Sequence, residues 1–450
     1  MVHDLTSGSP LRRILSFTFP ILIGNLFQQF YNIVDSIIVG KYLGVEAFAA
    51  VGSTGALNGL VLGFAVGICG GLCIPIAQNI GAGDIKQLRR AVAHGVYITA
   101  AVSIVISVVM LFCTKPLLIF LKTPENIVDD AAQYLTILFA GSSTMMMYNL
   151  LAGYIRALGD SRTPLYYLMI ACLLSAVLDL LFVGTLGMGV AGAAWATVFS
   201  QFLSGLLCLR AIKRNFPILH FTRDDAKFSF PLCLKLCRAS VPVGMQLFIT
   251  SIGSITLQTA VNGLGSAAVA AMSAGGKVQG VIVLPIDSTG GAIATFASQN
   301  YGARRIDRVR TGMRQIMMAC AGYSLIALLI AQLWGMEFAK IFLNNSETEI
   351  HGLVQTYFSI NSFFYIPLSL IYVYRNALQG LGYANAAMGS GILEMIGRAG
   401  VSVLLVGTFG FTAACFSNPA AWTMAGLFVL PMYGWVSKKL QRSLQSTGEG

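Results

Sequence analysis

Long apolar runs, separated by short polar connections, make up almost the whole chain. A helix that spans a bilayer needs about 20 mainly apolar residues, and about twelve runs reach that length. They cover residues 14–39, 48–76, 92–113, 129–156, 164–185, 188–209, 236–262, 266–297, 312–334, 350–377, 384–406 and 410–435. Several exceed a minimal span, so we expect tilted or bent helices. The pattern predicts an all-α polytopic membrane protein.

Composition supports this class and excludes others. The 450 residues are 56% hydrophobic and 10% charged, with a mean hydropathy of +0.74, which is not the composition of a soluble domain. The net charge of +11 would indicate a nucleic-acid partner only if the basic residues formed a patch on a soluble surface. They lie instead in the short connections. We therefore expect the lipid bilayer, and no nucleic acid, as a partner.

The basic residues concentrate in alternate connections. The basic clusters are Arg12 and Arg13, Lys86 to Arg90, Arg156 to Arg162, Arg210 to Lys235, Arg304 to Arg314, and Lys438 to Arg442. Because cytoplasmic loops are enriched in Lys and Arg, this alternation predicts that both termini are cytoplasmic. The first apolar run is too long and too polar for a cleavable signal peptide and lacks a small-residue cleavage site. We expect a multi-pass protein of the plasma membrane.

The chain also contains an internal repeat. The segment Gln78-Asn-Ile-Gly-Ala82 returns 221 residues later as Gln299-Asn-Tyr-Gly-Ala303. The repeat predicts two homologous lobes of about six helices each: an N-lobe at 1–212 and a C-lobe at 236–450, joined by a cytoplasmic linker at 213–235. Each lobe holds an even number of spans, so the lobes are parallel, with a pseudo-twofold axis along the membrane normal. Two such lobes suit alternating access by a rocking motion.

Polar residues inside the first apolar run form a stripe. The stripe consists of Asn25, Gln28, Asn32 and Asp35, whose steps of three, four and three residues place them on one helix face. Tyr31 lies one turn before Asp35, and Pro20 favours a bend in the helix. A charged side chain inside a membrane costs about 3 kcal/mol and is usually functional. We expect this face to line a watery cavity; the alternative is that Asp35 pairs with a buried partner and only holds helices together.

A second acid, Asp179, lies in the fifth run. At 1.5 Å per residue it is about 25 Å from the cytoplasmic Arg162, while Asp35 is about 9 Å from the outer Lys41, so both fall in the outer half of the N-lobe. Two carboxylates at similar depth could share a proton or hold a small cation. Alternatively, they are separately solvated acids lining a vestibule. The C-lobe lacks this pair, because Thr256 takes the place of Asp35.

The C-lobe carries other charges inside its runs. Glu394 and Arg398 are four residues apart, which predicts an ion pair on one helix face. Asp287 could attract a cationic substrate, or it could pair with Lys277. In the N-lobe, Met145 begins a run of three methionines, whose adaptable side chains suit a drug-facing surface, although consecutive residues point in different directions.

No feature indicates an enzyme. Gly187 to Gly192 spells a dinucleotide-binding fingerprint, but no strand–helix–strand pattern surrounds it. The nine cysteines and four histidines form no metal-ligand spacing. A nucleotide-binding Gly-x4-Gly-Lys motif is also absent from the sequence, so an ATP-driven pump is disfavoured. We expect no cofactor.

The chain resembles the multidrug and toxic compound extrusion (MATE) transporters along nearly its whole length. The residues that carry the resemblance are the two Gln-Asn-x-Gly-Ala segments, Arg156-Ala-Leu-Gly-Asp160 with Thr163-Pro164, Gly187 to Ala193, and Gln379-Gly-Leu-Gly382. The resemblance implies twelve helices in two six-helix bundles. It is strongest to the DinF-like branch, in which the N-lobe carries the essential acids.

The resemblance also implies roles for single residues. In that branch Asp35 and Asp179 match the ion-coupling acids, Pro20 matches the bend of the first helix, and Asn149 and Thr197 match further polar positions. The chain departs from the pattern at Ser175, where the branch usually has asparagine. This substitution puts cation coordination at that position in question.

The implied activity is antiport. An inward-moving ion, H⁺ or Na⁺, drives the export of organic compounds that are often cationic and amphipathic. Gln28, Tyr31, Asn32, Met145 and Asp287 are candidates to line the substrate cavity. We expect a prokaryotic protein that acts as a monomer. The alternatives are a flippase for lipid-linked saccharides and a structural or signalling membrane protein.

Overall fold

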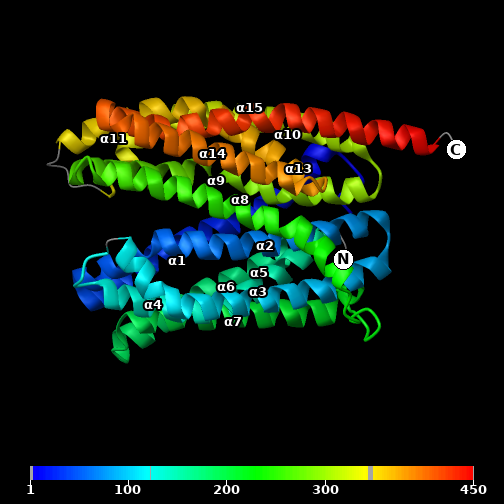
Figure 1. The fold of residues 1–450 in the computed structure, drawn as a ribbon, viewed down its shortest axis with the longest axis horizontal. Coiled ribbons are helices and arrows are strands. Elements are labelled where there is room, and N and C mark those ends of the chain that lie inside the picture. Colours follow the sequence, from blue (N-terminus) through cyan, green and yellow to red (C-terminus); the bar gives the residue numbers. More distant parts are fainter. Residues whose placement is uncertain (1–3, 122, 343–347, 449–450) are drawn as a thin grey trace. The chain divides into compact units, whose positions relative to one another are not determined.

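The computed structural model describes residues 4–121, 123–342 and 348–448, and within these residues it contains helices and no strand (Figure 1). The helices of the first half are α1 (Pro10–Ser53), α2 (Gly55–Ala82), α3 (Ile85–Phe120), α4 (Val128–Ala140), α5 (Ser142–Ala157), α6 (Arg162–Asp179), η1 (Leu180–Thr185), α7 (Gly189–Asn215) and η2 (Pro217–Leu219). Those of the second half are α8 (Phe230–Asn262), α9 (Ser266–Gly302), α10 (Ile306–Ala339), α11 (Thr348–Asn361), η3 (Ser362–Phe364), α12 (Tyr365–Leu370), η4 (Ile371–Arg375), α13 (Asn376–Gly380), α14 (Ala384–Leu404) and α15 (Val406–Gly448).

Every apolar run predicted from the sequence lies in a helical region, which confirms the all-α membrane fold. Among the described residues, nine helices are long and apolar enough to cross a membrane, and α4 with α5, bent by 47° at their junction, make a tenth. The two remaining runs, 14–39 and 384–406, are helical but more polar. They contain Asp35 and the charges Glu394 and Arg398.

The described chain packs as two compact units. Among the described residues, unit 1 consists of Asp4 with those from Phe19 to Gly244, and unit 2 of Leu5–Thr18 with those from Met245 onward. The start of α1 therefore packs with the second half of the chain, and the start of α8 packs with the first half. The lobe boundaries predicted at 212 and 236 follow the repeat and remain a prediction, because they do not coincide with these packing units.

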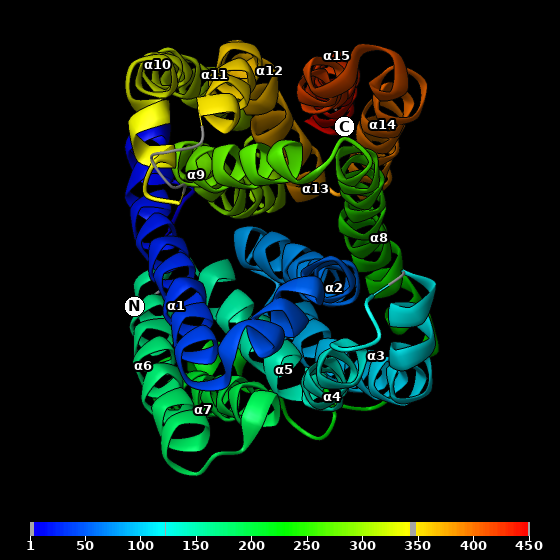
Figure 2. The same cartoon turned by 90° about the vertical axis from the view of Figure 1, so that its left-hand side faces the viewer.

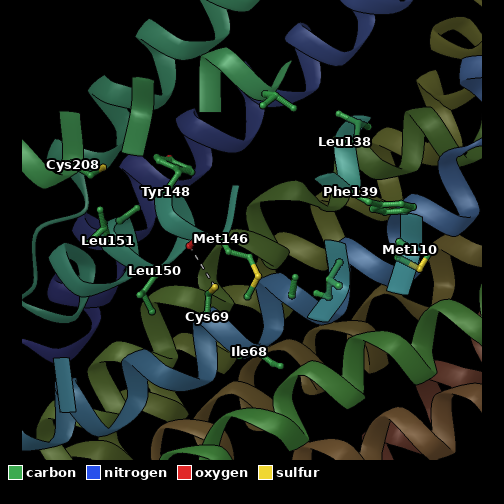
Figure 3. Packing of buried hydrophobic residues seen from close by; sticks show 14 of the residues in the cluster. Ile68, Cys69, Met110, Leu138, Phe139, Met146, Tyr148, Leu150, Leu151 and Cys208 are labelled. Atoms are coloured by element: carbon green, nitrogen blue, oxygen red, sulfur yellow. Dashed lines mark hydrogen bonds between the residues drawn. The ribbon is translucent and has the colours of Figure 1, made fainter. Parts of the chain in front are cut away.

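Unit 1 is a bundle in which α5 packs between its neighbours. It contacts α2, α3 and α7, while α7 also contacts α4 and α6 (Figure 2). Figure 3 shows part of the core, where Cys69 of α2 points toward Met146 of α5. The thiol of Cys69 donates to the Met146 carbonyl at 3.6 Å. Close packing of this kind fixes the bundle that carries the acids.

Two glycines bring α2 into backbone contact with the start of α8. A Cβ atom added at Gly67 would lie 2.6 Å from the Gly244 Cα atom, and one added at Gly71 would overlap the Ser240 Cα atom. Small residues four apart allow membrane helices to approach this closely. The contact explains why the first part of α8 belongs to unit 1.

The second copy of the repeated motif has a structural role in unit 2. The Leu5 amide donates to Gln299 Oε1 at 3.1 Å, and the Asn300 side chain donates to the Leu5 carbonyl at 3.2 Å. Arg305 and Arg308 donate to further carbonyls of the same segment. These bonds satisfy backbone groups at the start of the chain, and they fix that segment to the end of α9 and the start of α10.

We expect Gly67→Ala to lower stability and Gly70→Ala to leave it unchanged or raise it. The new methyl group at position 67 would meet the rigid backbone of α8, and overpacking costs about 1–3 kcal/mol. At position 70 nothing lies within 4 Å, and alanine is favoured over glycine in a helix by up to about 1 kcal/mol. Thermal unfolding in detergent measures both variants. Equal shifts would contradict the close contact between α2 and α8.

Candidate functional site

The two acids predicted in the N-lobe lie together in unit 1. Asp35 projects from α1 and is 8% exposed, while Asp179, the last residue of α6, is 0% exposed. Their side chains lie within hydrogen-bonding reach of each other. Helices that are distant in sequence thus bring two carboxyl groups to one buried point.

Few other polar groups form hydrogen bonds with the two carboxyl groups. Asp35 Oδ1 and both carboxylate oxygens of Asp179 are buried without a hydrogen-bond partner. An ionised carboxylate can only accept hydrogen bonds, so two ionised groups here would repel each other and leave their oxygens unsatisfied, at a large energetic cost. A proton on one group would let it donate to the other. The arrangement is therefore chemically suited to taking up one proton.

Tyr31 connects α1 to two other helices next to the acids. The Ser175 hydroxyl of α6 donates to the Tyr31 hydroxyl at 3.0 Å, and Tyr31 and Thr197 of α7 share a hydrogen bond of 2.8 Å. Tyr31 also lies close enough to Asp35 and Asp179 to interact with their charges. Three of the predicted polar residues thus meet in one network. In this network Ser175 serves as a hydrogen-bond donor to Tyr31.

A small cavity adjoins this network. Its volume is about 20 Å³, and its lining includes Gln28, Tyr31, Ser175, Thr197 and Gln201. The side-chain oxygen Oε1 of Gln201 is buried and without a partner. A polar cavity of this size has room for about one water molecule. The cavity thus offers a hydrated position beside the tyrosine.

Sequence reasoning missed Tyr134 of α4. Its side chain is 8% exposed and lies close enough to Asp35, Asp179 and Tyr31 to interact with all three. It also missed the π-helix η1, which begins directly after Asp179; π-helical turns occur frequently at functional sites. The neighbours of Tyr134 in sequence do not show that it lies beside the acids of α1 and α6, because that contact joins distant segments of the chain.

The other predicted N-lobe residues are placed differently. The Asn149 amide donates to the Met145 carbonyl of its own helix at 2.9 Å, and Met145 packs against the apolar core. Asn32 is exposed on α1. The helix α1 keeps helical torsions through Pro20 and is interrupted only at Gly44, where φ is 86°. A functional bend at Pro20 remains a prediction.

In unit 2 the charges pair differently from the expectation. Asp287 of α9 lies close enough to the Tyr372 side chain of η4 and to Arg375 to interact with both. Lys277 instead lies over the Phe342 ring, 5.2 Å from its centroid. The suggested pair of Asp287 with Lys277 is therefore wrong. Ten residues along one helix separate the two by about 15 Å.

Glu394 also has a closer partner than the sequence suggested. Arg375 Nη1 donates to Glu394 Oε2 at 2.8 Å, whereas the nearest Arg398 nitrogen is 4.0 Å from Glu394 Oε1. The predicted pair along α14 exists, but it is the longer contact. Arg375 comes from a different apolar run, so spacing along one helix could not reveal it.

Comparison with known proteins identifies the family. The MatE family model matches residues 20–181 and 242–404, one match in each half of the chain. The chain belongs to the MatE family. Among its MatE relatives, it is 30% identical over 383 residues to the probable multidrug resistance protein YpnP of Bacillus subtilis (strain 168), covering 84% of each chain. It is 21% identical over 387 residues to the FAD transporter of Shewanella oneidensis, covering 84% of this chain and 83% of that protein.

Solved structures show the same fold. An outward-facing multidrug resistance MATE transporter of the MOP superfamily matches with a TM-score of 0.89 at 22% identity, over 97% of this chain and 98% of that one. A MOP superfamily transporter from Pyrococcus furiosus matches with a TM-score of 0.90 at 23% identity over the same shares of the two chains. At this level of identity the likeness shows that the chain shares the fold of these structures.

We expect Tyr31→Phe to destabilise this MatE protein while Tyr42→Phe does not. The first change removes the acceptor of the Ser175 hydroxyl, which is 2% exposed, and leaving a buried polar group unsatisfied costs about 1–3 kcal/mol. Tyr42 lies on the same helix but is 51% exposed. Thermal unfolding of both variants in detergent measures the difference. If the unfolding midpoints of the two variants are equal, the hydrogen bonds of Tyr31 do not contribute to stability.

Proposed function

We propose that the protein is a proton-coupled antiporter that exports amphipathic organic cations across the plasma membrane. Membership of the MatE family supports transport, and relatives such as the one in Bacillus subtilis are named as probable multidrug resistance proteins. The observation that carries the coupling is the buried pair of Asp35 and Asp179, whose oxygens lack donors. Both termini face the cytoplasm in this proposal, and the chain acts as a monomer.

A proton suits this pair better than a sodium ion. Hard cations are bound by shells of several oxygen ligands. In the part of the chain that the structure describes, no three His, Cys, Asp or Glu side chains gather as metal ligands. The Ser175 hydroxyl, which was a candidate ligand, donates to Tyr31. Two carboxyl groups within hydrogen-bonding reach need only one proton to become mutually satisfied.

The coupling step follows from the position of Tyr31. It lies one turn before Asp35 on α1 and is bonded to α6 and α7. Protonation of the acid pair from outside removes its net repulsion and draws α1 toward α6. A bend of α1 near Pro20 then changes the shape of the N-lobe cavity and releases the substrate outward. Loss of the proton to the cytoplasm resets the helix.

The substrate cation is proposed to interact with Asp287. This acid lies close to Tyr372, and it is only partly buried. In unit 1, Gln28 and Asn32 are exposed on α1 and stay separate candidates for substrate contacts. An organic cation with apolar groups would match one acid within a mainly apolar surface.

We expect Asp35→Asn and Asp179→Asn each to abolish proton-driven transport. Either change removes one of the two groups that share the proton. Purified protein in vesicles is assayed for movement of ethidium, a fluorescent lipophilic cation, under a pH gradient or a Na⁺ gradient imposed separately. Asp129→Asn is the matched control, because Asp129 is exposed and paired with Lys115 at 2.6 Å. It should transport at the wild-type rate.

The outcomes separate the alternatives. Wild-type transport driven by Na⁺ alone would replace the proton by sodium. Wild-type rates in Asp35→Asn would contradict the coupling mechanism. A folded wild type that responds to neither gradient would favour the flippase for lipid-linked saccharides.

A further inference from the structure

Unit 2 contains a buried charge cluster that the coupling mechanism does not use. Glu394 of α14 is 5% exposed, and Arg375 of η4 and Arg398 of α14 are 8% and 5% exposed. Arg375 donates to the Glu394 carboxylate at 2.8 Å. Buried acids and bases are tolerated when they are paired and bonded in this way.

The charged side chains of this cluster all have hydrogen-bond partners. Arg398 donates to the Asn418 side chain at 2.9 Å and to the Thr250 carbonyl and the Ser254 hydroxyl, each at 3.2 Å. The Thr250 hydroxyl donates to Glu394 Oε2 at 3.4 Å. Neither oxygen of Glu394 is among the buried unpartnered atoms of the described residues. Arg398 is thus held mainly by other partners, and Arg375 is the main neutralising group.

The acid sites of the two units differ in charge. Asp179 directly precedes the π-helix η1, and Arg375 is the last residue of the π-helix η4. In unit 1, two acids face each other, and three of their oxygens have no donor. In unit 2, the acid is already matched by a guanidinium. The position that a coupling ion would take beside Glu394 is therefore filled by a side chain.

We propose that Arg375 acts as a tethered cation that keeps Glu394 ionised and prevents unit 2 from taking up a coupling ion. Arg375 is a positioning residue: it acts through Glu394 and contacts no transported ion. The proposal rests on the proposed function, because it explains why coupling is confined to Asp35 and Asp179. Removing the guanidinium should create a new proton site at Glu394.

The first test needs no transport. Arg375→Gln, Arg375→Lys and the double variant Arg375→Gln/Glu394→Gln are purified, and their thermal unfolding is followed from about pH 5 to about pH 8. In Arg375→Gln, Glu394 loses its closest cation and keeps only the longer contact with Arg398, so it should take up a proton in the folded state. Stability relative to the double variant should therefore be greatest at low pH and fall as the pH rises. Arg375→Lys keeps the charge and should follow the wild type.

The possible results decide the assignment to Arg375. Parallel pH profiles of Arg375→Gln and the double variant would overturn it, because Arg398 would then neutralise Glu394 alone. If Arg375→Gln is recovered folded only at acid pH, the proposal is supported. If it is recovered at no pH while the double variant folds, the proposal fails, because a proton should rescue Glu394.

The second test counts ions. Vesicles with opposed pH and ethidium gradients are adjusted until net transport stops, and the balance point gives the number of protons moved per ethidium. We expect Arg375→Gln to move one more proton than the double variant, in which Asp287 has lost the same neighbouring guanidinium, and Arg375→Lys to match the wild type. An equal number in Arg375→Gln and the double variant would contradict the proposal. A wild type without proton coupling would refute the proposed function. The pH profiles of stability would still test whether Arg375 keeps Glu394 ionised.

Discussion

Two carboxyl groups that touch inside a membrane bundle, with almost no donor around them, set the main constraint on this structure. Asp35 and Asp179 are nearly or fully buried, and three of their four oxygens lack a partner. Water solvates ionised carboxylates far better than a low-dielectric interior does. In the proposed mechanism, a proton on the pair relieves this cost, and any change that separates or hydrates the pair favours its release. The proposed proton site rests on this burial and geometry.

The surrounding helices link the charge state of the two acids to the positions of α1, α6 and α7. Asp35 and Tyr31 lie on the same face of α1, and Tyr31 is hydrogen-bonded to α6 and α7 through Ser175 and Thr197. The charge state of the pair thus determines whether the two side chains, and with them α1 and α6, attract or repel each other. In unit 2, the buried negative charge of Glu394 is neutralised by its ion pair with Arg375. Both units are bundles of helices, but the buried acids of unit 1 have no cationic partner in the described structure, whereas the buried Glu394 of unit 2 is paired with an arginine.

Much of this organisation could be predicted from the sequence, because it depends on local patterns. Apolar run length predicted the helices, and the spacing of four residues placed Tyr31 one turn before Asp35 on the first helix. What the sequence could not show is contact between distant helices. Tyr134 beside the acids, Arg375 on Glu394 and Gln299 on Leu5 each join segments far apart in the chain. The pair of Asp287 with Lys277 was wrong because two charges in one helix were considered without the neighbouring π-helix that supplies Tyr372.

The most direct test of the central claim is infrared spectroscopy of the purified protein at neutral pH. A protonated carboxyl group has a C=O stretch that is distinct from that of a carboxylate and shifts in D₂O. The account predicts such a band in the wild type, and its loss in the double variant Asp35→Asn/Asp179→Asn, because that variant removes both groups that can hold the proton. A wild type without the band, or a band that persists unchanged in the double variant, would show that the two acids do not hold a proton between them.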